Sequence, residues 1–105
     1  DLVERFYKSS IEKDPKFFDS YFNIGVLYNN RAAFIYDKIA DIKDDAKYNE
    51  AKKGADEIYL KAVPYFEKAH ELRPDDKPTM QQLKKLYAKT NDTAKYEAMK
   101  KLLGE

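Results

Sequence analysis

Residues 21–42 read YFNIGVLYNNRAAFIYDKIADI, and this stretch decides the fold. Its apolar residues recur along the chain in alternating steps of four and three. This stripe contains Tyr21, Gly25, Tyr28, Ala32, Ile35, Ile39 and Ile42. Sustained 4-3 spacing keeps one face of a helix turned toward a partner helix. The stretch therefore predicts a long helix that packs along one side.

A second stretch, residues 48–72, has the same spacing. Its stripe contains Tyr48, Ala51, Ala55, Ile58, Ala62, Tyr65, Ala69 and Leu72. A short polar connection around residues 43–47 separates the two stretches, and short connections join antiparallel neighbours. We therefore predict an extended, antiparallel, coiled-coil-like hairpin in which large side chains mostly face small ones. The expected pairs are Ile42 with Ala51, Ile39 with Ala55, Ile35 with Ile58, Ala32 with Ala62, Tyr28 with Tyr65 and Gly25 with Ala69.

Further polar breaks, some of them marked by proline, delimit the remaining helices. They fall at residues 13–15, 73–78 and 90–93, and no alternating strand pattern is present. The sequence therefore predicts an all-α fold of about five helices, at 2–13, 17–43, 47–72, 77–90 and 93–103. Pro64 lies inside the third of these helices, where it removes one backbone hydrogen bond and is expected to kink the helix.

Composition excludes several classes of partner. Lys plus Arg is 20 and Asp plus Glu is 19, which leaves a net charge of +1. We therefore expect no nucleic-acid partner and no anionic membrane surface, since both require a basic surface. The chain has no cysteine, and no apolar run approaches the roughly 20 residues of a membrane span. It begins with Asp1 and not with Met, so we expect it to be cut from a longer protein of unknown compartment, with the cytoplasm and the periplasm both open.

Two motifs resemble the tetratricopeptide repeat (TPR). Tyr21-x2-Ile24-Gly25-x2-Tyr28 is similar to the first half of that repeat, and Ala62-x3-Phe66, with Ala69 and Pro74, is similar to the second. Partial copies flank them. A second half precedes them as Val3-x3-Tyr7 with Pro15, and a first half follows as Met80-x2-Leu83-Lys84-x2-Tyr87, in which Lys84 replaces the usual glycine. The resemblance implies a bacterial-type TPR-like α-α superhelix.

The spacing of the motifs indicates an insertion. Pro15 and Pro74 are 59 residues apart, whereas the repeat has a period of about 34 residues. The extra 25 residues lie between the two helices of the central repeat and would lengthen each helix by roughly 18 Å. We expect a single domain, in which 1–15 is the second helix of a truncated repeat, 16–76 the expanded central repeat and 77–105 a C-terminal repeat.

The resemblance also implies a site. The first helix of each TPR lines a concave groove that receives a peptide or protein, and the residues expected there are Phe22, Asn23, Val26, Asn29, Asn30, Gln81, Gln82, Lys85, Ala88 and Lys89. The family's carboxylate clamp needs basic residues and asparagines on this face in consecutive repeats. It is not matched here, because the central repeat has Phe22 and Val26 on that face. A second interpretation is that these two residues pack on a neighbouring helix and that the lysines are merely solvated.

Two aromatic residues suggest an alternative function. Phe34 and Tyr36 lie in the insertion and off the 4-3 stripe, where no partner within the chain is obvious. They predict a surface for self-association, as a homodimer or by domain swapping, although single exposed aromatic residues are common. Tyr59 and Val63 also leave the stripe, and we expect them to face the helix that begins near Thr79.

No pattern of residues predicts catalysis. His70 is the only histidine, and we expect it to be a surface residue late in its helix. The pairs Asp44-Asp45 and Asp75-Asp76 are expected to stabilise helix ends rather than to bind a metal. We therefore predict a non-enzymatic protein without catalytic residues, metal or cofactor, which either binds a protein or peptide partner or associates with itself.

Overall fold

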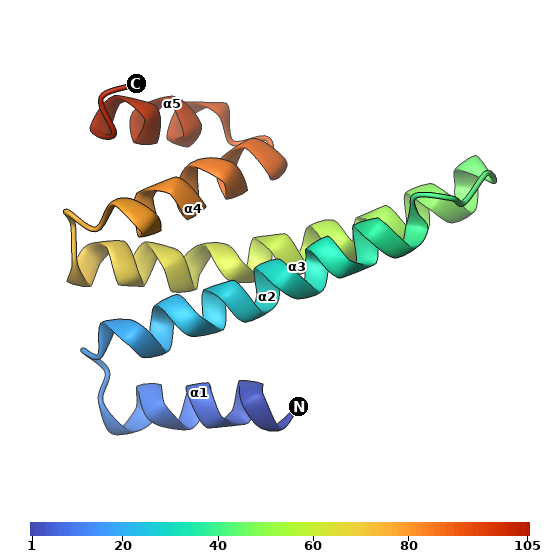
Figure 1. The fold of residues 1–105 in the computed structure, drawn as a ribbon. Coiled ribbons are helices and arrows are strands. Elements are labelled where there is room, and N and C mark those ends of the chain that lie inside the picture. Colours follow the sequence, from blue (N-terminus) through green and yellow to red (C-terminus); the bar gives the residue numbers. More distant parts are fainter.

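The computed structural model describes all residues of the chain, 1–105, and contains five helices and no strand (Figure 1). The helices are α1 (Leu2–Lys13), α2 (Phe18–Ile39), α3 (Asp45–Leu72), α4 (Lys77–Lys89) and α5 (Thr93–Leu102). The predicted all-α fold is confirmed.

Aspartate caps begin four of the five helices. Asp44, Asp76 and Asp92 each accept a hydrogen bond from the backbone N–H three residues later, at 3.1, 3.1 and 3.2 Å, and Asp1 caps α1 in the same manner. Such a cap satisfies one of the free N–H groups of the first turn and contributes about 1 kcal/mol. Asp44 and Asp76 therefore have the structural role that the sequence predicts for them.

The hairpin turn lies earlier than predicted. α2 ends at Ile39, four residues before the predicted end, and α3 begins at Asp45, two residues before the predicted start. Ile39 is buried, whereas Ile42 is exposed in the connection. No other helix flanks the tip (Figure 1), so little apolar area could be buried by continuing α2 through the polar residues around Ile42.

The two long helices pair as an antiparallel hairpin. Tyr28 and Tyr65 meet as predicted, with ring centroids 5.7 Å apart. The ring of Phe66 lies against Gly25, a contact that the sequence does not predict. Ala69 packs in a small cluster with Phe18 and Tyr21. α3 continues as one helix through Pro64, whose side chain is exposed.

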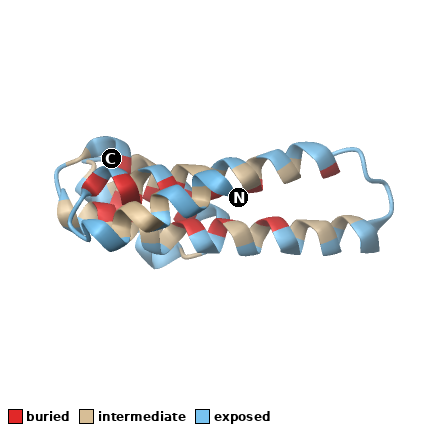
Figure 2. Cartoon of the chain, turned by 90° about the horizontal axis from the view of Figure 1, so that it is seen from below, coloured by how far each residue is buried: buried red, intermediate tan, exposed pale blue.

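The other helices flank one end of this hairpin. α1 packs against α2, α4 packs against α3, and α5 packs against α4, so that the opposite end of the hairpin projects alone (Figure 1). The main core lies where α2, α3, α4 and α5 meet, and its completely buried members include Ile24, Phe66, Leu83 and Leu86. Figure 2 shows the buried residues gathered at this end. The projecting end of the hairpin is therefore stabilised only by the contacts between α2 and α3.

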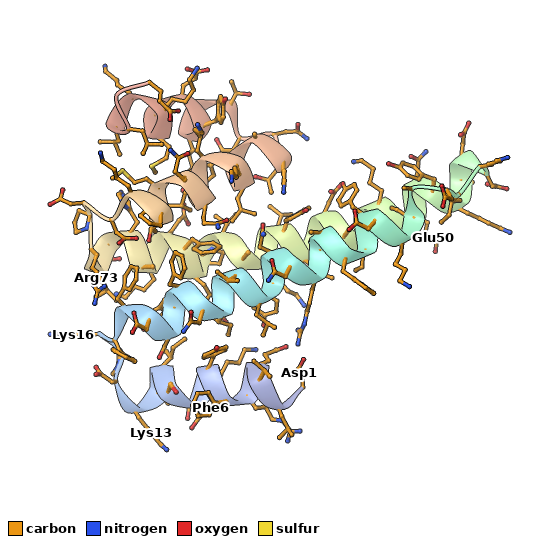
Figure 3. The ribbon with its side chains drawn as sticks, in the orientation of Figure 1. Asp1, Phe6, Lys13, Lys16, Glu50 and Arg73 are labelled. Carbon is orange, nitrogen blue, oxygen red and sulfur yellow. The ribbon has the colours of Figure 1, made fainter.

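α1 is held by both apolar and polar contacts, and its Tyr7 and Ile11 side chains pack against the main core. None of its residues is fully buried. Glu4 accepts hydrogen bonds from Arg31 at 2.7 Å and from Tyr28 at 2.9 Å, and Arg31 also pairs with Asp1. Phe6 points away from α2 into solvent (Figure 3).

Candidate functional site

The residues predicted to bind a partner form one surface of α2 and one of α4, which we call the α2/α4 face. On α2, Asn23 and Asn30 are exposed, while Val26 and Asn29 are half-buried. Phe22 is half-buried as well, and it packs edge-on against Phe66 of α3 with ring centroids 5.5 Å apart. Phe22 and Val26 border the main core. Phe22 and Val26 therefore lie beneath the exposed amide side chains and are not free to insert into a partner. This supports the interpretation that they pack on a neighbouring helix.

On α4 the predicted residues divide into two groups. Lys85, Ala88 and Lys89 are exposed, and Gln81 and Gln82 are half-buried. The Gln81 amide donates to Glu105 at 3.4 Å, so it is turned toward the carboxyl end of the chain. Neither Lys85 nor Lys89 makes a salt bridge. The two lysines leave positive charge free at the carboxyl-terminal end of α4.

Lys84 takes the position that glycine usually occupies in the repeat. Its ammonium group donates to Glu105 at 2.6 Å. The hydrogen bond from Lys84 is the main cause of the lowered pKa of Glu105. The long side chain thus ties α4 to the end of α5, a contact that the spacing of the motif does not predict.

A cavity lies where the projecting hairpin leaves the flanking helices. It has a volume of about 320 Å³ and is lined by Tyr36, Lys52, Tyr59, Lys89 and Asn91. We call it the hairpin-base pocket. Its residues come from α2, α3, the end of α4 and the turn before α5, so the pocket forms only when all these elements are packed together.

The rings of Tyr36 and Tyr59 form the apolar wall of the pocket. Their centroids are 5.8 Å apart with an angle of 32° between the planes. The expectation that Tyr36 has no partner within the chain is therefore wrong, because it contacts Tyr59. Tyr59 itself is buried in the main core, and Val63 packs against that core, as the sequence predicts.

Asp56 of α3 links Tyr36 of α2 to Lys52 of α3 beside this wall. It accepts a hydrogen bond from the hydroxyl of Tyr36 and another from Lys52 at 2.9 Å. Burial alone would raise the pKa of Asp56, but these two hydrogen bonds outweigh burial and lower the pKa. Burial and the neighbouring carboxylate raise the pKa of Tyr36. At neutral pH the site therefore holds an ionised carboxylate, a neutral tyrosine and a protonated lysine.

Lys89 is the one charged group of the pocket without an ionic partner. Its ammonium lies 4.5 Å from the centroid of the Tyr59 ring and donates to the Tyr59 hydroxyl at 3.3 Å. A cation over an aromatic face is moderately stabilised, but its charge is not neutralised. The group remains available to an anion.

The remaining predicted residues are more dispersed. Phe34 is 61% exposed, with the ammonium of Lys38 5.1 Å from its ring centroid. His70 is half-buried, and its Nδ1 has no hydrogen-bond partner. No group of three or more His, Cys, Asp or Glu side chains lies close enough to hold a metal ion, and none of the helices has the length and apolar character of a membrane span.

Comparison with known proteins gives one finding. The model of a tetratricopeptide repeat matches residues 6–53, which include most of α1, all of α2 and the first turns of α3. The matched range contains the motif from Tyr21 to Tyr28 and ends before the second motif, which begins at Ala62. The curated proteins and the solved structures gave no match.

Proposed function

Because the model of a tetratricopeptide repeat matches residues 6–53, we propose that the chain is a member of this family and a protein–protein interaction scaffold that binds a peptide or protein segment along the α2/α4 face. Tetratricopeptide repeats generally mediate protein–protein interaction and are typically non-enzymatic. The proposal for this chain adds the face, the kind of partner and the absence of a catalytic role.

The supporting observation is the presence of unpaired polar groups on a partly apolar face. The side chains of Asn23 and Asn30 are exposed and make no hydrogen bond within the chain, and Lys85 is free of carboxylates. An amide side chain can both donate to and accept from a peptide backbone. The half-buried Phe22 and Val26 add apolar area below these groups, which is the composition that a peptide-binding surface requires.

A peptide library displayed on phage provides a probe that does not presuppose the partner. We expect selected peptides to shift the NMR signals of the α2/α4 face. In the variant Asn23→Ala/Asn30→Ala the affinity should fall about tenfold, because two sets of hydrogen bonds are lost. A matched control is Lys61→Ala/Glu57→Ala, on exposed positions of α3. Equal weakening by both pairs, or shifts confined to other surfaces, would contradict the proposal.

A second candidate function is self-association through the hairpin. The specific observation is that the hairpin exposes Phe34 and Leu60, which are 61% and 55% exposed. Burial of such side chains against a second copy would remove apolar area from water.

A further inference from the structure

The hairpin-base pocket lies at one end of the α2/α4 face. Lys89 belongs to both, since it is the last residue of α4 and lines the pocket. Tyr36 and Lys52, by contrast, lie in the lengthened part of the hairpin, beyond the residues that carry the two motifs. The pocket is therefore a product of the long hairpin, and a segment bound along the face can reach it.

The pocket carries one uncompensated positive charge. Of its two lysines, Lys52 is paired with Asp56 at 2.9 Å, and the second oxygen of Asp56 accepts from Tyr36. Lys89 has only the ring and hydroxyl of Tyr59 as neighbours. A monoanion next to Lys89 would be neutralised, whereas a dianion such as phosphate would keep one charge without a free cation, because Lys52 is already paired with Asp56.

Size and lining restrict the occupant further. A volume of about 320 Å³ is at the lower limit of pockets that hold small ligands. It suits one amino-acid side chain with its backbone. The wall of Tyr36 and Tyr59 can contact an aliphatic stem, while Lys89 and the amide of Asn91 can donate to a carboxylate.

We infer that the hairpin-base pocket binds the carboxylate of a single glutamate or aspartate side chain in the partner segment. This inference rests on the proposed function, because the side chain is presented by a segment lying on the α2/α4 face. Lys89 supplies the charge and Tyr36 and Tyr59 supply the apolar contact. Lys52 and Asp56 position Tyr36 and do not themselves bind the carboxylate.

The test uses small probes that need no known partner. N-acetyl-glutamate α-amide carries a side-chain carboxylate only, N-acetyl-glutamine amide is its neutral isostere, and N-acetyl-leucine carries a terminal carboxylate only. Inorganic phosphate is the fourth probe. In titrations of the intact chain followed by NMR, we expect the glutamate probe to shift the signals of Tyr36, Tyr59 and Asn91 with a dissociation constant of about 1–10 mM.

Variants assign the effect to the pocket. Lys89→Gln should weaken the glutamate probe about tenfold, because a charge-assisted hydrogen bond is lost. Lys61→Gln removes an exposed charge on α3, outside both the pocket and the α2/α4 face, and should change the constant less than twofold. Both positions are at the surface, and circular dichroism verifies that the variants remain folded.

Several results would overturn the inference. Among them are equal binding of the glutamate and glutamine probes, phosphate binding as strong as that of the glutamate probe, and equal losses in Lys61→Gln and Lys89→Gln. Stronger binding of N-acetyl-leucine would also overturn it, in favour of a terminal carboxylate. The proposed function is tested separately by the phage peptides, so peptides that shift the α2/α4 face without acidic residues at one end would refute the pocket and leave the scaffold role intact.

Discussion

At the scale of single residues, Gly25 controls how closely the two long helices approach. A Cβ atom at this position would lie 2.8 Å from the ring of Phe66, which is completely buried. The ring would have to move in a packed core. We expect Gly25→Ala to lower the free energy of unfolding by about 1–3 kcal/mol, which thermal denaturation followed by circular dichroism would detect.

Gly54 offers a matched control for this substitution. It lies inside α3, it is exposed, and a Cβ atom there would meet nothing within 4 Å. Gly54→Ala should therefore stabilise the protein by roughly 0.5–1 kcal/mol, through helix propensity alone. If both alanine variants raised the melting temperature, the close contact between Gly25 and Phe66 would be wrong.

At the scale of helices, one carboxylate, that of Glu4, contributes to the attachment of α1. Hydrogen bonds from Arg31, Lys8 and Tyr28, in that order, lower the pKa of Glu4 to about 2. A carboxyl whose pKa is lowered on folding stabilises the native state above its unfolded pKa of about 4.3. This stabilisation is lost as the pH falls from that value toward 2.

We therefore expect Glu4→Gln to destabilise the protein by about 1–2 kcal/mol at pH 7, a value reduced for solvent screening of a partly exposed group. The difference from the wild type should shrink below pH 4.3 and vanish near pH 2. Urea unfolding at pH 7, 4 and 2.5 measures it. Glu12→Gln is the control on the same helix, because Glu12 is exposed and forms no salt bridge. A difference that does not depend on pH would refute an electrostatic role.

The elements themselves were largely predictable, and their lateral packing was not. Periodicity and aspartate caps are local signals, and they predicted all five helices and the meeting of Tyr28 with Tyr65. The contact between Tyr36 and Tyr59 was missed because both residues lie beside the stripe. One signal was available: each directly follows a stripe residue, Ile35 and Ile58, that the sequence predicts to pair.

The hairpin-base pocket could not be predicted from periodicity. It needs Lys89 at the end of α4 and Asn91 in the following turn, where Asn91 has a positive φ of 61°. The position of this turn over α3 depends on how α4 packs, and no local pattern determines that packing. The α2/α4 residues were identified through the family motif, but the burial of Phe22 follows from its contact with Phe66 of α3.

At the scale of the whole molecule, stability is distributed unevenly along the hairpin. Beyond Ala32 in α2 only Ile39 is buried, and before Tyr59 in α3 only Ala55 is buried. Figure 2 shows the mostly exposed arm. Segments with few buried apolar contacts open locally at a small free-energy cost. We expect amides of residues 36–52 to exchange with deuterium at least tenfold faster than those of residues 59–69, as measured by mass spectrometry. Equal protection of the two segments would show that a further contact stabilises the arm.

The exposed arm also leads to the prediction for self-association. Phe34→Ser removes an aromatic ring that is 61% exposed, and substitutions at such positions usually change stability by less than about 0.5 kcal/mol. We expect the melting temperature to stay the same, while any concentration-dependent increase in sedimentation coefficient is lost. Lys53→Ser, on an exposed position of the same arm, is the control and should leave association unchanged. A wild-type protein that sediments as a monomer at every concentration would exclude the hairpin as a self-association surface. A large drop in the melting temperature of Phe34→Ser would instead assign Phe34 to the core, because helix propensity alone changes stability by less than about 1 kcal/mol.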